Sequence, residues 1–330
     1  MYAFVLKAPN QWEVQDVEAP TGEDGEVVIQ VKAAAVNPLD AMMAKEGFMI
    51  GSFPARLGVE VSGIISAIGP NVTTFKVGDP VVARPQFDGF ADYATATVRH
   101  VWPKPADLSY AEAATVPIGT LTASIGLFSD KGLKLVRPRD AKQQQMPREH
   151  LLVWGGTSTV GSYAVQLGAA AGYSVIATAS PKQHSAVRAL GAVHVVDYNA
   201  PDAVEQIRKL TGGECRFAFD AVGGTVTAQA AAALRADVDH PSKIATVGVA
   251  SGEVPVGVTL LPMIMAFDPT LIDFINEVIG DEIIGYVAQR KIKPCHVRIV
   301  EGGLHGIGEA LELLAARKVS GEKLVITLPG

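Results

Sequence analysis

The stretch that decides the fold is Leu151-Leu152-Val153-Trp154-Gly155-Gly156-Thr157-Ser158-Thr159-Val160-Gly161. Four apolar residues, typical of a buried strand, run into a glycine-rich turn, and a helical pattern follows over residues 159–171. Residues 151–181 carry no formal charge, and a membrane span needs only about 20 predominantly apolar residues. Because glycines and hydroxyl side chains interrupt this run, we interpret it as a buried part of a soluble fold.

The turn Gly156–Gly161 resembles the G-x-G-x-x-G turn that binds dinucleotides, with Ser158 at the position of the middle glycine. We expect Gly156 to allow the tight turn and Gly161 to let the helix pack close to the strand. Ser158 would loosen the backbone approach to a pyrophosphate but add a hydroxyl donor. The helix N-terminus would present amides to that pyrophosphate. The other predicted contacts come from Thr157, Thr159 and Val160. An ordinary glycine-rich turn is the alternative.

The end of the second expected strand predicts which dinucleotide binds. NAD sites usually place Asp or Glu about 20 residues beyond the glycines, to bind the ribose 2′-hydroxyl. Here the chain offers Ser180 and Lys182, which would hold a 2′-phosphate, so NADPH is favoured. The alternative is that Lys182 is only a solvated residue at the start of a helix. The remaining candidate cofactor residues are Tyr198, Val222 and Gly248.

Strands alternate with helices from residue 151 onward. The expected strands cover 151–154, 174–178, 193–196, 216–220 and 243–247, and the expected helices cover 159–171, 182–190, 202–210 and 225–235. This alternation indicates right-handed βαβ units and a doubly wound parallel sheet. Beyond the stretch 251–269, which holds three prolines, we expect helices over 270–291 and 305–317 and strands over 296–300 and 323–328.

The first 110 residues show a different pattern of expected secondary structure. Short β-runs over 27–31, 59–68, 80–83 and 91–97, separated by turn signals, predict a small barrel or a sandwich-like module. Ser109 and Glu112 form a capping-box pattern, which predicts a helix beginning at residue 110. The polar segment Lys131–His150 is interpreted as an exposed linker or surface loop.

The composition excludes several classes of function. With 28 Lys and Arg against 34 Asp and Glu, a net charge of −6 and no basic run, a nucleic-acid partner is not expected. Hydrophobic residues make up 48% and charged residues 19% of the chain, which excludes a largely disordered protein. Cys215 and Cys295 show no metal-type spacing or disulfide framework, and the start of the sequence lacks the pattern of a secretory signal. We therefore expect a cytoplasmic protein that is not bound to a membrane.

Several motifs identify a family. The chain resembles the medium-chain dehydrogenase/reductase superfamily over nearly its full length. The residues that carry the resemblance are Gly58-Val59-Glu60, Gly63, Gly69, Phe75-Lys76-Val77-Gly78-Asp79, the Gly156–Gly161 turn and Ser320-Gly321-Glu322-Lys323-Leu324-Val325. The resemblance implies a GroES-like β-rich catalytic domain over 1–122, a Rossmann domain that binds NADPH over 123–302, and a segment over 303–330 that returns to the catalytic domain.

Many members of the superfamily hold a catalytic zinc ion, and this sequence departs from their pattern. Asn37 stands where the first Cys ligand would be, Val59 stands where the His would be, and Pro117–Thr120 offers no thiol or imidazole. Zinc needs three or four N, S or O ligands. The resemblance therefore implies a zinc-independent member with no metal site.

Within that branch, several segments look like those of trans-acting enoyl reductases, which partner fungal polyketide synthases. They are Asn37-Pro38-Leu39-Asp40, Leu152–Gly161, Ala179–His184, the insertion over 131–148 and Glu301-Gly302-Gly303-Leu304. Quinone oxidoreductases and alkenal reductases are close relatives. The apolar residues Met263, Met265 and Phe267 either line a pocket for a long acyl chain or pack in the core.

The resemblance implies hydride transfer from C4 of NADPH to the β-carbon of an α,β-unsaturated carbonyl. The developing enolate needs hydrogen-bond donors, and the candidate catalytic residues are Asn37, Asp40 and Thr120. Each has a structural alternative: Asn37 precedes Pro38 in a turn, Asp40 caps a helix over 41–45, and Thr120 bonds a backbone carbonyl. No general acid stands out, so the proton on the α-carbon would come from solvent.

We retain three functions. The first is reduction of a polyketide or acyl intermediate, either as a small molecule or bound to a carrier and synthase. The second is reduction of small diffusible quinones or alkenals. The third is nucleotide binding by an accessory protein without redox turnover, because a fold alone does not fix a function. A monomer and a homodimer both remain open.

Overall fold

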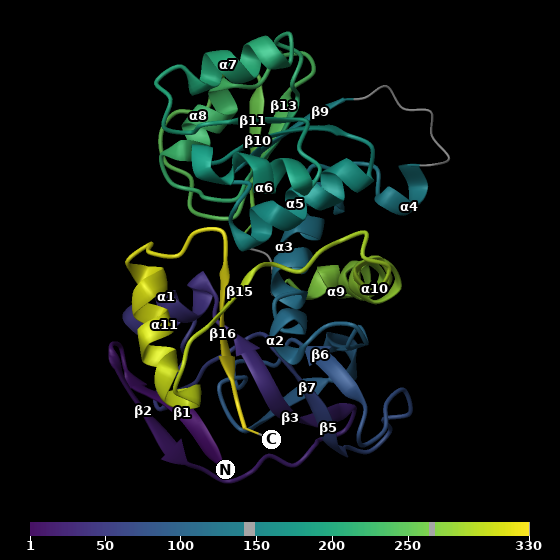
Figure 1. Ribbon diagram of the computed structural model, residues 1–330, viewed down its shortest axis with the longest axis vertical. Coiled ribbons are helices and arrows are strands. Elements are labelled where there is room, and N and C mark those ends of the chain that lie inside the picture. The colour runs from purple at the N-terminus through teal and green to yellow at the C-terminus, as the bar shows by residue number, and fades with distance from the viewer. Residues whose placement is uncertain (142–148, 264–267, 330) are drawn as a thin grey trace. The chain divides into compact units, whose positions relative to one another are not determined.

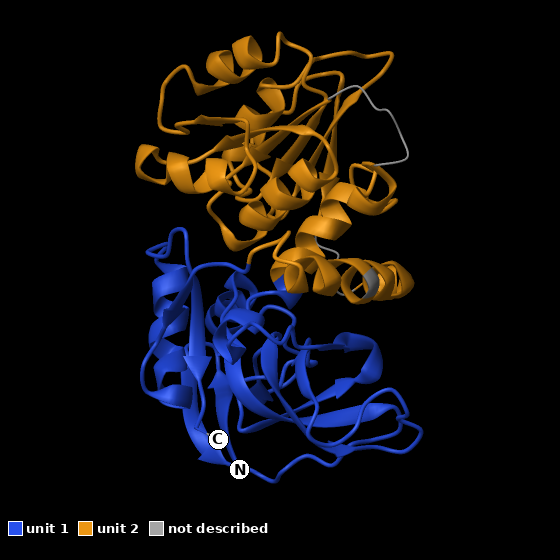
Figure 2. Ribbon diagram, turned by 45° about the vertical axis from the view of Figure 1, so that its right-hand side comes forward, with its two compact units in different colours: residues 1–118, 294–330 blue, residues 119–293 orange. Residues whose placement is uncertain are grey.

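The computed structural model describes residues 1–141, 149–263 and 268–329. The chain divides into two compact units (Figure 2). Unit 1 contains residues 1–118 and 294–330, and unit 2 contains residues 119–293. The domain limits expected at residues 122 and 302 stay predictions, because compact units and family domains need not share the same limits.

Unit 2 is built on a six-stranded parallel sheet in the order β11-β10-β9-β12-β13-β14. Figure 1 labels β9, β10, β11 and β13 of this sheet. Its strands are β9 (His150–Trp154), β10 (Ser174–Thr178), β11 (His194–Val196), β12 (Phe217–Asp220), β13 (Ser242–Thr246) and β14 (Val258–Pro262). The connecting helices are α5 (Thr159–Ala170), η2 (Pro181–Gln183), α6 (His184–Ala189), α7 (Ala203–Leu210) and α8 (Val226–Ala232). The doubly wound sheet predicted from the sequence is confirmed. The sequence did not predict β14, because three prolines in residues 251–269 made this stretch look unlike a strand.

Parallel strands buried on both faces explain why residues 151–181 lack charge. The core joins Leu152, Ile176 and Ile244 of three strands to Ile207 of α7 and Ala230 of α8, and all five side chains are buried. An ionised side chain at such a position would be costly without a partner.

Unit 1 contains two sheets. The smaller has the order β2-β1-β4, and the larger has the order β15-β16-β3-β5-β6-β8, with β7 also pairing with β3. The strands are β1 (Tyr2–Ala8), β2 (Gln11–Asp16), β3 (Glu26–Ala35), β4 (Ala55–Arg56), β5 (Val61–Ile68), β6 (Pro80–Ala83), β7 (Tyr93–Thr97), β8 (Val101–Pro103), β15 (Val297–Ile299) and β16 (Lys323–Thr327). Its helices are α1 (Pro38–Glu46), η1 (Val98–His100), α2 (Tyr110–Ala113), η5 (Gly303–Gly306) and α11 (Ile307–Ala315). β16 pairs antiparallel with β3, so the C-terminal strand completes a sheet begun near residue 26.

The capping box predicted at residue 110 is confirmed. Ser109 precedes α2, and its hydroxyl accepts a hydrogen bond from the Glu112 amide at 3.2 Å. α3 (Pro117–Phe128) follows shortly afterwards. By length and composition alone, Tyr110–Phe128 could cross a membrane, but 78% of that window is buried inside the structure, as in the core helix of a globular protein.

α3 packs tightly on the sheet of unit 2. A Cβ atom built on Gly126 would lie 2.3 Å from Cε2 of Phe219 in β12. Two carbon atoms that are not bonded to each other do not come this close. The absence of a side chain at residue 126 therefore sets how closely α3 approaches the sheet of unit 2.

We expect Gly126→Ala to lower the free energy of unfolding by about 1–3 kcal/mol, because an added methyl group overpacks a dense core. Gly285→Ala in α10 (Ile284–Ala288) is the matched control, since a Cβ there meets no atom within 4 Å. Alanine is about 1 kcal/mol better than glycine in a helix, so the control should be neutral or stabilising. Urea unfolding of both variants measures the difference, and equal losses would contradict the packing argument.

The helix predicted over 270–291 is present as four consecutive elements. They are η3 (Pro269–Leu271), α9 (Ile272–Asn276), η4 (Glu277–Ile283) and α10. η4 is a π-helix, a rare form with i→i+5 hydrogen bonds. Residues five apart in an α-helix point about 140° away from each other, whereas the wider turn of η4 brings Glu277 and Glu282 to one side.

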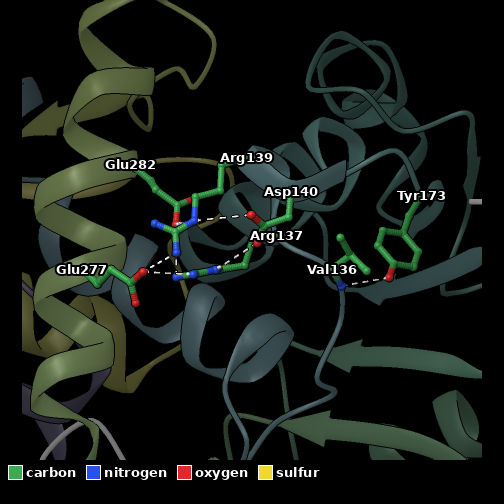
Figure 3. A network of polar contacts seen from close by, with 7 residues as sticks. All are labelled: Val136, Arg137, Arg139, Asp140, Tyr173, Glu277 and Glu282. Carbon is green, nitrogen blue, oxygen red and sulfur yellow. Dashed lines mark hydrogen bonds and ion pairs between the residues drawn. The ribbon is translucent and has the colours of Figure 1, made fainter. Parts of the chain in front are cut away.

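That side of η4 faces two arginines (Figure 3). The Arg137 guanidinium lies 3.0 Å from a Glu277 carboxylate oxygen and 3.2 Å from a Glu282 carboxylate oxygen. Arg139 pairs with the same two carboxylates and with Asp140. Because the two carboxylates share both cations, the ion pairs favour the π-helical winding over the α-helical one.

The prediction of an exposed loop over 131–150 was wrong for its first half. Leu133, Leu135 and Pro138 are buried, α4 (Pro138–Ala141) is helical, and the Tyr173 hydroxyl accepts a hydrogen bond from the Val136 amide at 3.2 Å (Figure 3). Among the described polar side chains of this segment, Lys131 pairs with Asp268, and Arg137 and Arg139 pair with Glu277. Residues 142–148, and likewise Met265 and Phe267, lie outside the described residues.

Candidate active site

The candidate cofactor residues of unit 2 all follow the carboxyl ends of its strands. Because the six strands are parallel, these ends share one edge of the sheet. The Gly156–Gly161 turn follows β9, Ser180 and Lys182 follow β10, Tyr198 follows β11, Val222 follows β12 and Gly248 follows β13. The strand order reverses between β9 and β12, and ligands of doubly wound sheets bind at such a switch point. The structure therefore brings the predicted residues to one place.

The tight turn after β9 depends on Gly155, so its assignment to Gly156 was wrong. Gly155 has φ +82°, a left-handed conformation, and a Cβ built there would lie 2.5 Å from Cγ2 of Val222. Gly156 does not have a positive φ, and its Cβ would meet that of Ala177 at 3.0 Å. The turn is anchored on Thr178, whose hydroxyl accepts from the Gly155 amide and whose carbonyl accepts from the Gly156 amide.

Ser158 is the N-cap of α5. Its hydroxyl accepts a hydrogen bond from the Gly161 amide and donates one to the Gly155 carbonyl, both at 3.0 Å. The hydroxyl is therefore used within the turn, which corrects the expectation of a free donor. A Cβ on Gly161 would lie 2.1 Å from the Gly155 carbonyl oxygen, so the helix approaches the turn as closely as expected.

Two backbone amides at this helix start are available to an anion. The amides of Thr157 and Val160 have no acceptor among the described residues. The N-terminal end of α5 adds the positive end of the helix dipole, and such ends bind phosphate groups. These features, together with the close approach at Gly155 and Gly161, fit the pyrophosphate of a dinucleotide.

The segment after β10 carries an unneutralised cation. The Lys182 side chain is exposed and forms no ion pair within the described parts of the chain, and the Ser180 hydroxyl has no partner there either. No carboxylate occurs in Ala179–His184. Tyr198, after β11, is also exposed. The chemistry of this segment suits a phosphate better than a pair of ribose hydroxyls.

Thr120 lies on α3, next to a close contact with α5. A Cβ on Gly119 would lie 2.7 Å from the Tyr163 ring and 2.9 Å from Cγ2 of Thr159, so α3 rests directly on the first turn of α5. Thr120 is fully buried. The structure thus places this candidate catalytic hydroxyl on the helix that covers the start of the dinucleotide turn.

In unit 1, Asn37 and Asp40 lie together at the start of α1, which covers residues 38–46 rather than the expected 41–45. The Asp40 carboxylate accepts a hydrogen bond from the Asn37 amide at 2.8 Å, which is a capping contact. The Asn37 side chain donates to the Ala35 carbonyl at 3.3 Å and to Glu60 at 3.2 Å, and accepts from the Lys323 ammonium at 2.5 Å. Both side-chain N–H groups of Asn37 are therefore engaged within unit 1.

Two functional candidates were missed from the sequence, Glu60 and Lys323. Their charged groups lie 3.1 Å apart and are almost completely buried. The second oxygen of Glu60 accepts from the Ile118 amide at the start of α3, at 2.7 Å. Both residues belong to motifs that carry the family resemblance. A charge that interrupts an apolar strand, as Glu60 does between Val59 and Val61, is the signal that could have found them.

Burial raises the pKa of the Asp40 carboxyl to about 7, against the opposing effect of the hydrogen bond from Asn37 and of the Lys323 charge. Its Oδ1 atom has no hydrogen-bond partner among the described residues. The nearby Glu60 carboxylate raises the pKa further. Asp40 therefore changes its charge near neutral pH.

The folded chain binds a proton at Asp40 up to about pH 7, whereas the unfolded chain releases it near pH 4. The free energy of unfolding should thus fall as pH rises through this window, by a few kcal/mol at most. Asp40→Asn cannot ionise, so we expect its stability relative to wild type to increase from pH 5 to pH 8 in urea unfolding. Asp130→Asn, at an exposed side chain, is the control. A stability difference that does not vary with pH would refute the assignment.

The described residues contain no group of three or more His, Cys, Asp or Glu side chains that could hold a metal ion. Val59 is buried where zinc-dependent relatives would place an imidazole, and Asn37 is bound to Glu60 and Lys323.

The fold and the site define a dinucleotide-binding oxidoreductase. Residues 23–122 match the model of the alcohol dehydrogenase GroES-like domain, and residues 159–275 match that of the zinc-binding dehydrogenase domain. The chain belongs to the medium-chain dehydrogenase/reductase superfamily, as the sequence motifs predict, and it is an oxidoreductase.

Relatives match along nearly the whole chain. Dehydrogenase azaJ of Aspergillus niger is 33% identical, over 99% of this chain and 99% of that protein. Trans-enoyl reductase phm4 of Pyrenochaetopsis sp is 29% identical, over 95% of this chain and 92% of that protein. Among solved structures, the CurK enoyl reductase superposes with a TM-score of 0.82 at 27% identity and covers 99% of both chains.

Proposed function

We propose that this chain is an NADPH-dependent, zinc-independent reductase of an activated carbon–carbon double bond. It would act in the cytoplasm as a trans-acting enoyl reductase, on a polyketide or acyl intermediate presented by a separate synthase. The observation that carries the choice of cofactor is the segment after β10, where Ser180 and Lys182 follow the strand and Lys182 forms no ion pair with any described residue. The choice of reaction is supported by relatives and a solved structure that are named as enoyl reductases.

NADPH, when bound, supplies the hydride. The amides of Thr157 and Val160 would bind its pyrophosphate at the N-terminus of α5. Ser180 and Lys182 would bind the 2′-phosphate, where a carboxylate would repel it. Charge-assisted hydrogen bonds of this kind are stronger than neutral ones, so the phosphate contacts would dominate the preference over NADH.

The reaction would develop negative charge on the carbonyl oxygen of the substrate, which hydrogen-bond donors stabilise. Asn37 of unit 1 is the proposed donor. For Asn37 this requires one N–H to leave its present acceptor, and the contact with the Ala35 carbonyl, at 3.3 Å, is the longest of its three hydrogen bonds. Lys323 and Glu60 would hold the planar carboxamide fixed, so the substrate oxygen would have to take the place of the Ala35 carbonyl at that N–H. The α-carbon would take its proton from solvent.

The test is NADPH oxidation, followed at the nicotinamide absorbance, with an enoyl thioester on an acyl-carrier protein, a free enone and a quinone as separate substrates. We expect the carrier-bound thioester to give the highest kcat/KM. Turnover confined to free enones or quinones would favour a detoxifying reductase instead. Tight NADPH binding without oxidation by any of the three would refute a reductase and favour an accessory protein.

Lys182→Glu tests the phosphate contact. Loss of a charge-assisted hydrogen bond and gain of a repulsive charge should raise the KM for NADPH by about tenfold or more and leave the KM for NADH nearly unchanged. Lys209→Glu is the matched control, because Lys209 is exposed in the last turn of α7, at the opposite end of its βαβ unit from the candidate site. Equal effects of Lys182→Glu on the two cofactors would show that residue 182 does not bind the 2′-phosphate.

A further inference from the structure

One buried carboxylate outside the sequence-predicted set organises the edge of the sheet where the dinucleotide would bind. Asp220 is the last residue of β12, beside the point where the strand order reverses, and it is fully buried. No Lys, Arg or His pairs with it in the part of the chain that the structure describes. A buried carboxylate without a cation is costly unless hydrogen-bond donors replace water.

Four donors do replace water at Asp220. Its Oδ1 atom accepts from the amides of Val222 and Gly223, at 2.9 and 3.0 Å. Its Oδ2 atom accepts from the hydroxyls of Thr227 and Thr246, at 2.6 and 3.1 Å. One side chain thus ties together the end of β12, the turn after it, the first turn of α8 and the end of β13.

The turn that Asp220 holds, Ala221–Gly224, touches both neighbouring loops. Val222 meets the turn after β9, since its Cγ2 atom leaves only 2.5 Å for a Cβ on Gly155. Gly223 lies against Gly248 after β13, where a Cβ would come within 2.8 Å of the Gly248 Cα. The Gly224 amide donates to the Val249 carbonyl at 2.9 Å. The position of this turn therefore sets the spacing of the loops that follow β9, β12 and β13.

Val222, within this turn, has an exposed side chain. Its side chain is 47% exposed although it is apolar and lies directly over the glycine turn. A shift of the 221–224 turn would move Val222 toward or away from the place where the pyrophosphate and the adjoining ribose would lie.

We propose that Asp220 is a positioning residue of the dinucleotide site, which fixes the Ala221–Gly224 turn so that Val222 and Gly248 form one wall of that site. The inference rests on the proposed binding of the dinucleotide at the Gly155–Gly161 turn. It assigns to Asp220 no contact with the cofactor, and it predicts that loss of its hydrogen bonds weakens dinucleotide binding without slowing the chemical step.

The first test compares Asp220→Leu, which accepts no hydrogen bond, with Asp220→Asn, which keeps one acceptor oxygen for the two amides and can donate to the two hydroxyls. Asp220→Leu should raise the Kd for NADPH and its KM by about tenfold and leave kcat at saturation within about twofold of wild type. Asp220→Asn should stay within about threefold of wild type. Faster hydrogen exchange of the Val222 and Gly223 amides should accompany the loss of affinity.

Thr227→Val and Thr227→Ser are a second pair of variants that disturb the structure less. They test the role of Asp220 even if Asp220→Leu does not fold. Valine keeps the shape of threonine and removes the hydroxyl that donates to Asp220 at 2.6 Å, whereas serine keeps the hydroxyl. We expect a Kd for NADPH raised about threefold or more for valine and unchanged for serine.

Variants with a lowered Tm but an unchanged Kd would overturn this inference and leave the proposed function intact, because Asp220 would then be only structural. A wild-type chain that binds neither NADPH nor NADH would instead overturn the proposed function, and the inference with it.

Discussion

The reversal of strand order between β9 and β12 is the constraint on which unit 2 depends. From β9 the chain moves outward through β10 to β11, and then returns to place β12 on the other side of β9. Ligands of doubly wound sheets bind at the edge of the sheet beside such a switch point, and here the turn after β12 packs on the turn after β9 at that edge. The packing contacts that matter most lie at this edge: Gly155 beneath Val222, Gly223 against Gly248, and α3 on the first turn of α5.

Unit 1 depends on a different interaction, the buried ion pair of Lys323 and Glu60. Removing one partner of such a pair would leave a buried charge uncompensated and lower the free energy of unfolding by several kcal/mol. The pair also fixes what surrounds it, since Asn37 binds both residues and Glu60 holds the Ile118 amide at the start of α3. Three side chains bound to each other, Asn37, Glu60 and Lys323, thus fix the geometry at Asn37.

Sequence patterns predicted the parallel sheet well, because strands buried on both faces leave long uncharged runs that few other structures produce. They failed where the outcome depends on partners distant in the chain. Spacing could not distinguish Gly155 from Gly156, since only the backbone torsion and the Val222 contact do so. The π-helical winding of η4 depends on Arg137, which precedes Glu277 by 140 residues. For the same reason the role of Asp220 could not be predicted from the sequence, because two of its donors come from α8 and β13.

The return of β16 to unit 1 has a consequence for biosynthesis. Lys323 follows Asn37 by 286 residues, which a ribosome translates in roughly 15–60 s at about 5–20 residues per second. All of unit 2 emerges in that interval, so it can fold while unit 1 still lacks β15 and β16. Meanwhile Glu60 has no cation, and the edge of β3 that β16 later covers is open to pairing with other chains. The nascent chain is thus exposed to misassembly along β3 until β16 pairs with that strand and brings Lys323 to Glu60.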